Sequence, residues 1–311
     1  MSERVRITEV GPRDGLQNEP GVIAASNKIR LIELLMRTGV DEIELTSFVS
    51  PRWVPQLADA EEVLEGVRDL VGKHRHPVFS VLAPNMRGFE RAVAIHELGF
   101  PLKLALFAAA SETFSRKNTN ASIDDSIRRL REVIPEAVAA GMPLRLYISC
   151  AVACPYEGDI EPRSVRAVAD RLLEAVKPER RAAVDLDLGD TIGRATPDQI
   201  DALLDAFDDL TPQLTLHLHD TLGQATSCVE RGLDRGVRSF DGSVAGLGGC
   251  PFASTPQNRA PGNIATGRLV DCVEAAGYET GIDREDLAKA ATFATRIVEA
   301  ARRGGGGGTD A

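Results

Sequence analysis

Residues 184–220 read VDLDLGDTIGRATPDQIDALLDAFDDLTPQLTLHLHD, and this stretch contains one complete strand–helix–strand unit. Apolar and polar residues alternate at both ends, in residues 184–188 and 214–219, as they do in half-buried strands. The middle carries a helical pattern that starts at Thr196-Pro197, a capping residue followed by a proline of the first turn. Two strands that are joined through a helix lie parallel in one sheet. The stretch therefore predicts a parallel α/β fold.

The same unit recurs along the whole chain. Strands are predicted at residues 5–10, 42–47, 78–83, 102–107, 144–149, 184–188, 214–219 and 237–244. Helices are predicted at residues 27–38, 56–70, 87–98, 123–140, 162–176, 197–210, 224–235 and 264–276. Ser26 precedes the first helix as a cap, and glycines at 39, 99, 141 and 236 stand where helices end. Eight strands, each followed by a helix, predict a (β/α)8 TIM barrel.

One domain is expected to span residues 1–303. It includes an extra C-terminal helix at residues 284–303, and the glycine-rich tail at 304–311 is expected to be disordered. The rival fold is an open doubly wound sheet, which usually carries GxGxxG after its first strand. Here that place is taken by Gly11-Pro12-Arg13-Asp14-Gly15, which favours the barrel.

Composition limits the possible partners of the chain. Its 311 residues contain 36 Lys and Arg against 46 Asp and Glu, a formal charge of −10, which argues against a nucleic-acid-binding surface. No apolar run approaches the roughly 18 residues of a membrane span, so we expect no membrane partner. The first residues carry no signal-peptide pattern, and the five cysteines include no CxxC pair. We therefore expect a protein of the reducing cytoplasm.

Functional residues of a barrel lie at the C-terminal ends of its strands. The seventh strand ends in His217-Leu218-His219-Asp220. Side chains alternate along a strand, so the leucines face the outer helices while both histidines point into the barrel. Two inward imidazoles at i and i+2 can bind one metal ion, and the alternative is a hydrogen-bonded histidine pair in a polar core layer.

Three other strands also carry polar residues, either on their inward faces or just after their ends. Arg13 and Asp14 follow the first strand, and Glu44 faces inward on the second. A buried carboxylate needs a partner, which makes Arg13 the expected partner of Glu44. On the sixth strand, Asp185 and Asp187 alternate with leucines, and we expect Asp185 to form a salt bridge inside the barrel.

Residues 242–251 follow the eighth strand and are rich in glycine, so the backbone there can approach a ligand closely. Cys250 at the tip of this stretch is poorly placed for core packing and could act as an acid or base. Beyond it, the amide oxygen of Asn263 could bind a metal. Together, Asp14, His217, His219 and Asn263 form a mixed oxygen and nitrogen set, which favours Mg²⁺ or Mn²⁺ while leaving zinc and cobalt open.

Six segments together resemble the 3-hydroxy-3-methylglutaryl-CoA (HMG-CoA) lyase family of the DRE-TIM metallolyase superfamily. They are VGPRDGLQNE at 10–19, TSFVSP at 46–51, CPYEG at 154–158, LGDTIG at 188–193, HLHDT at 217–221 and SVAGLGGCP at 243–251. The resemblance implies a metal-dependent retro-Claisen cleavage of HMG-CoA to acetyl-CoA and acetoacetate, and a homodimer.

The resemblance also implies roles for individual residues. Asp14, His217, His219 and Asn263 resemble the metal ligands, and either Asp14 or His217 is the expected base. Arg13 resembles the residue that stabilises enolate charge, Glu44 the acid that positions it, and Cys250 the proton donor. Gln17, Ser47 and Asp190 resemble polar groups that bind substrate.

Several positions depart from the family pattern. Residues 254–261 make a longer link before Asn263, Gly267 replaces a usual glutamate, and Asp187 stands where a small hydroxyl residue is common. These changes leave open a lyase for another 3-hydroxy-3-substituted acyl-CoA, such as citramalyl-CoA or a longer branched analogue. A barrel that binds acyl-CoA or metal without turnover is the non-enzyme alternative.

Overall fold

A closed barrel of parallel strands forms the centre of the protein in this computed structural model, which describes residues 3–71, 77–249 and 262–304. Around the barrel, neighbouring strands follow the order β1-β10-β9-β8-β5-β4-β3-β2, and β1 pairs with both β10 and β2. The strands are β1 Arg6–Glu9, β2 Glu42–Ser47, β3 Val78–Leu82, β4 Lys103–Ala109, β5 Leu144–Ser149, β8 Asp185–Asp190, β9 Leu214–Leu218 and β10 Ser239–Gly242. The predicted TIM barrel is confirmed.

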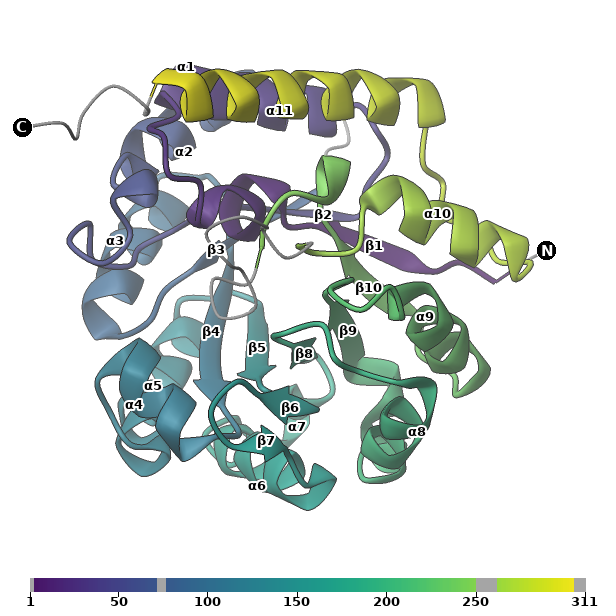
Figure 1. Ribbon diagram of the computed structural model, residues 1–311. Helices are drawn as coiled ribbons and strands as arrows, with labels where there is room; N and C mark the ends of the chain where they lie inside the picture. Colours follow the sequence, from purple (N-terminus) through teal and green to yellow (C-terminus); the bar gives the residue numbers. More distant parts are fainter. Residues whose placement is uncertain (1–2, 72–76, 250–261, 305–311) are drawn as a thin grey trace, which may run out of the picture.

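Helices surround the barrel on the outside (Figure 1). They are α1 Ala25–Leu35, α2 Ala60–Leu70, α3 Met86–Glu97, α5 Ile123–Ala139, α6 Pro162–Leu173, α8 Pro197–Asp205, α9 Ala225–Asp234, α10 Thr266–Ala275 and α11 Arg284–Gly304. Thr196 caps α8 through a reciprocal capping box with Gln199, as its sequence predicts. The four expected helix-ending glycines have φ angles of 83°, 86°, 78° and 88°, the left-handed conformation of such caps.

The structure adds short elements that hydrophobic periodicity does not reveal. Helix α4 Glu112–Thr119 is mostly polar, and it forms because the Ser111 side chain accepts a hydrogen bond from the backbone of Phe114. Strands β6 Ala153–Cys154 and β7 Gly158–Asp159 form a small antiparallel pair, and α7 is the single turn Pro178–Arg181. Ser26 is not a cap, because α1 already begins at Ala25. Short turns complete the chain: η1 Gly11–Gly15, η2 Pro55–Leu57, η3 Asp208–Gln213 and η4 Val244–Gly246.

The last helix, α11, lies along α1 on the outside of the barrel (Figure 1). Near its end Arg302 donates two hydrogen bonds of 2.9 Å to the fully buried carboxylate of Glu19. This ion pair fastens α11 to the segment that follows η1. Helix α11 extends to Gly304, and the rest of the tail expected to be disordered lies outside the described residues.

Candidate active site

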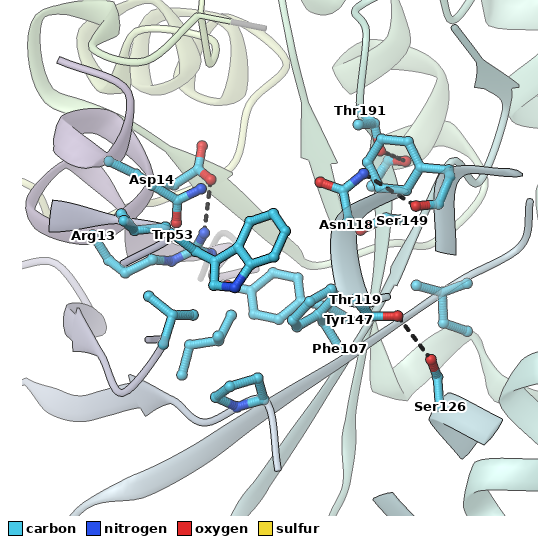
Figure 2. Close-up of a pocket in the computed structure, with 18 of the residues that line it drawn as sticks. Arg13, Asp14, Trp53, Phe107, Asn118, Thr119, Ser126, Tyr147, Ser149 and Thr191 are labelled. Carbon is cyan, nitrogen blue, oxygen red and sulfur yellow. Dashed lines mark hydrogen bonds and ion pairs between the residues drawn. The ribbon is translucent and has the colours of Figure 1, made fainter. Parts of the chain in front are cut away.

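A cavity of ≈ 470 Å³ opens at the ends of the strands. Arg13, Asp14, His217 and His219 line its inner part. Figure 2 shows Arg13 and Asp14 on one side of the cavity, with polar side chains of the β4–β5 side opposite them. The volume falls within the range of small-molecule sites, and the mixture of apolar walls with a few convergent polar groups is typical of them.

Asp14, His217 and His219 converge on one point at the base of this cavity. An oxygen of Asp14 lies 4.0 Å from Nε2 of His217 and 3.9 Å from Nε2 of His219. The two Nε2 atoms are 3.2 Å apart. The inward orientation that strand alternation predicts for both histidines is therefore confirmed, and three potential ligand atoms lie close enough to share one ion.

Asn263 adds a fourth donor to this cluster. Its Nδ2 donates to Asp14 Oδ2 at 2.8 Å and to the carbonyl of Leu247 at 3.1 Å. Its Oδ1 is buried and has no hydrogen-bond partner among the described residues. A buried carbonyl oxygen without a partner is costly, and a cation bound here would satisfy it. The donor set of one carboxylate, one amide oxygen and two imidazoles therefore fits a divalent metal ion.

Arg13 is held rigidly beside the cluster. Its Nε donates to Glu44 Oε2 at 2.6 Å, and its terminal nitrogen donates to Asp14 Oδ1 at 2.7 Å. The hydroxyl of Tyr147 donates to the same Glu44 oxygen at 3.3 Å, and the guanidinium lies 5.5 Å from the Tyr147 ring centre. Glu44 is fully buried, and its contact with Arg13 confirms the pairing that the sequence predicts.

A second buried layer lies directly below the histidines. Nδ1 of His217 lies 2.9 Å from Asp241 Oδ2, and the guanidinium of Arg145 binds both Asp241 and Asp187. Arg145 also donates to the Thr8 hydroxyl at 3.0 Å. The carboxylate of Asp241 selects the tautomer of His217 that leaves Nε2 free for a metal.

The surroundings of the two histidines move their pKa values in opposite directions. Burial lowers the pKa of His217, but the hydrogen bond and charge of Asp241 outweigh it and raise that pKa to about 9. Burial and the neighbouring charge of His217 lower the pKa of His219 to about 4. Burial raises the pKa of Asp14, yet Arg13 and the two histidines together hold it well below its usual range. The cluster thus keeps Asp14 ionised and His219 neutral, the protonation states of metal ligands, whereas His217 must release its Nε2 proton when a metal binds.

Glu9 joins the η1 turn, which carries Asp14, to η4 and to the start of α10. Its carboxylate accepts hydrogen bonds of 2.8 Å from the backbone of Gly11 and of Val244, and one of 2.6 Å from the Thr266 hydroxyl. A Cβ atom on Gly11 would lie 2.6 Å from this carboxylate, so the turn requires glycine there. Burial raises the pKa of Glu9 to about 7.

The remaining predicted site residues have different surroundings. Gln17 lines the cavity, whereas Ser47 and Asp190 are absent from its described lining. The Asp190 carboxylate accepts backbone hydrogen bonds from Arg194 at 3.1 Å and Ala195 at 2.8 Å. Cys250 lies outside the described residues. Asp185 forms the expected interior salt bridge, at 2.6 Å from Lys103.

Sequence reasoning did not single out Asp241, Arg145 or Tyr147. The signal was available, because Asp241 follows Phe240 on β10, and Arg145 and Tyr147 alternate with leucine and isoleucine on β5. The alternation that identified the histidines applies equally to these inward side chains.

Comparisons with known proteins identify the family of this chain. The HMGL-like family profile matches residues 4–294. The chain belongs to the HMGL-like family. Within the family, the mitochondrial hydroxymethylglutaryl-CoA lyase of Gallus gallus is 44% identical over 293 residues, which cover 94% of this chain and 92% of the relative.

Solved structures of HMG-CoA lyases share this fold. The enzyme from Brucella melitensis superposes with a TM-score of 0.86 at 42% identity, covering 96% of this chain and 100% of that one. The enzyme from Acinetobacter baumannii, solved in complex with coenzyme A and 3-methylmalate, has a TM-score of 0.84 at 32% identity, covering 95% and 92%. Family and fold therefore agree with the resemblance that the sequence segments carry.

Proposed function

We propose that this protein is a metal-dependent carbon–carbon lyase that cleaves HMG-CoA to acetyl-CoA and acetoacetate. The observation that supports this most directly is the convergence of Asp14, His217 and His219, with the unpartnered oxygen of Asn263, beside the guanidinium of Arg13 in one cavity. A metal site next to a fixed cation suits a reaction that deprotonates a hydroxyl and places negative charge on a neighbouring oxygen.

Asp14, His217, His219 and Asn263 would hold the divalent cation, with Mg²⁺ or Mn²⁺ as the proposed ion. A bound divalent cation lowers the pKa of the substrate's C3 hydroxyl. Either Asp14 or His217 accepts the proton of that hydroxyl. His217 is buried, Asp14 is partly exposed, and both lie within a few ångströms of the same point, so the geometry leaves the two as alternatives.

Cleavage of the C2–C3 bond turns C3 into the ketone of acetoacetate. The bonding electron pair remains on C2 and is delocalised onto the thioester oxygen. Arg13 stabilises that enolate charge, and its bonds to Glu44 and Asp14 fix the guanidinium before the reaction. A proton from the Cys250 thiol to C2 then completes acetyl-CoA.

The wider assignments remain predictions. Acyl-CoA is the proposed small-molecule partner, the chain is proposed to form a homodimer, and its proposed location is the cytoplasm. No helix in the described part of the chain is long and apolar enough to cross a membrane.

A coupled assay for acetyl-CoA release tests the proposal. The purified protein is treated with EDTA and then assayed with HMG-CoA, citramalyl-CoA and a longer branched analogue, before and after Mg²⁺ or Mn²⁺ is added back. We expect metal-dependent release from HMG-CoA with the highest kcat/KM. Higher kcat/KM for another thioester would reassign the substrate. Metal-replete protein that binds these thioesters but releases no acetyl-CoA from any of them would contradict the proposed lyase activity.

A further inference from the structure

An exposed tryptophan stands at the mouth of the active-site cavity. Trp53 is the only tryptophan in the chain, and 74% of its surface is exposed. It lines the same cavity as Asp14 and His219. In the close-up, its indole projects into the open space between Arg13 on one side and Asn118 on the other (Figure 2). Single exposed apolar side chains are common, so exposure alone carries no argument.

The loop that presents Trp53 is firmly anchored. The backbone N–H of Trp53 donates to the carbonyl of Ser50 at 2.9 Å. Three residues later, the Gln56 side chain accepts from the backbone of Ile23 at 3.0 Å and donates to the carbonyl of Gly21 at 2.7 Å. Lys28 then holds Asp59 at 2.8 Å. The indole is therefore carried on a restrained backbone beside the opening, an arrangement that favours binding because little ordering is needed.

We propose that Trp53 is a binding platform for the pantetheine arm of the acyl-CoA substrate. The inference rests on the proposed function, because it takes the acyl group to lie at the Asp14, His217 and His219 cluster. The arm then leaves the cavity past its rim, where the indole face covers it. Contact with this amphipathic chain removes apolar indole surface from water.

The walls of the cavity near Trp53 suit the arm better than the nucleotide. Val49, Val54 and Leu82 supply apolar surface, and Asn85 supplies an amide that can bond to the amides of pantetheine. The nucleotide end carries several phosphate charges. Among the described lining residues, the arginines are Arg13, already paired with two carboxylates, and Arg129 of α5.

The lone tryptophan gives a direct binding test. Because Trp53 is the only indole, tryptophan emission of the wild-type protein reports on this position alone. The metal-loaded protein is titrated with acetyl-CoA, S-acetylpantetheine and adenosine 3′,5′-bisphosphate. We expect a saturable shift of the emission with the first two ligands, and only the absorbance artefact of adenine with the third. A response to the bisphosphate without one to S-acetylpantetheine, or no response to any ligand, would overturn the proposal.

Kinetics of variants provide the second test. Trp53→Ala is expected to raise KM for HMG-CoA about tenfold, equivalent to about 1.4 kcal/mol, with kcat little changed, while Trp53→Phe keeps most of the affinity. The rise in KM caused by Trp53→Ala should persist when the substrate is the HMG thioester of pantetheine. It should shrink with the HMG thioester of N-acetylcysteamine, which lacks most of the pantetheine arm. Leu98→Ala, at a 70% exposed position that precedes β4 at the other end of the barrel, is the matched control and should leave KM unchanged.

The two proposals fail in distinguishable ways. Saturable emission changes without acetyl-CoA release from any thioester would reject the lyase and keep the platform. Normal turnover with an unchanged KM in Trp53→Ala, whose fold is checked by circular dichroism, would reject the platform and keep the lyase.

Discussion

Replacing Asp241 by asparagine should weaken metal binding although Asp241 is not itself a proposed ligand. The Asp241 carboxylate lies 2.9 Å from Nδ1 of His217 and forces that nitrogen to carry the proton. An asparagine can turn its NH₂ group toward Nδ1, which then becomes the acceptor and moves the proton to Nε2. Nε2 is the atom that faces Asp14 and His219, and a protonated nitrogen cannot bind a metal.

The expected loss of metal affinity can be estimated, because Asp241 orients a histidine that is proposed to bind the metal. Loss of the partner that orients a metal-bound histidine typically costs about 10- to 100-fold in metal affinity. That range corresponds to roughly 1.4 to 2.7 kcal/mol. We expect the Kd for Mn²⁺, measured by the electron paramagnetic resonance of free Mn²⁺, to rise by this factor in Asp241→Asn. Activity measured at saturating Mn²⁺ should recover more fully than activity at low Mn²⁺.

Asp187→Asn is the matched control for this experiment. Asp187 and Asp241 bind the same guanidinium of Arg145 and are equally buried, yet only Asp241 is within hydrogen-bond distance of His217. The control variant should therefore share any loss of stability, measured by thermal unfolding, without the loss of Mn²⁺ affinity. Equal Mn²⁺ affinity in wild type and Asp241→Asn would refute the reasoning. An equal loss in both variants would assign the effect to the charge around Arg145 instead.

Two further predictions concern Glu9 and Cys250. The folded pKa of Glu9 is raised from 4.5 to about 7, so wild-type stability falls as pH rises through this window, by about 3 kcal/mol. Glu9→Gln should remove that slope. Its free energy of unfolding in urea, relative to that of wild type, should therefore be higher at pH 8 than at pH 5. The same difference at both pH values would contradict the prediction. Cys250→Ser should lower kcat about 100-fold or more, as loss of a general acid does, while Mn²⁺ affinity and thermal stability stay unchanged. A silent substitution would exclude the thiol as proton donor.

Local patterns predicted the fold well because each strand and helix carries its own signal. Short apolar runs located all eight barrel strands, and the glycines at helix ends adopt the positive φ that their position required. Helix α4 was missed because its stability comes from the Ser111 cap and a single buried Phe114, which leaves no apolar stripe. Ser26 was misassigned because helix ends depend on backbone geometry that one side chain does not determine.

Alternation also predicted which face of each strand carries the site, but not which residues meet across strands. In the structure, Asp241 of β10 pairs in register with His217 of β9, which places the carboxylate beside the imidazole. A shift of this register would remove the contact while preserving the alternation of both strands. Register arises from closure of the whole barrel, so no single strand sequence contains it.

This limit explains why the residues of the proposed metal site were easier to bring together from the sequence than the residues that contact them. Asp14, His217 and His219 follow or end their strands, where the fold brings all strands to one opening, so position along each strand is enough to gather them. Arg145 and Asp241 lie one layer deeper, where contacts depend on barrel closure. The deeper layer nevertheless fixes the tautomer of His217, so the chemistry at the opening depends on pairings within the barrel. Substitutions at inward positions below the site should therefore alter metal affinity without touching a proposed ligand.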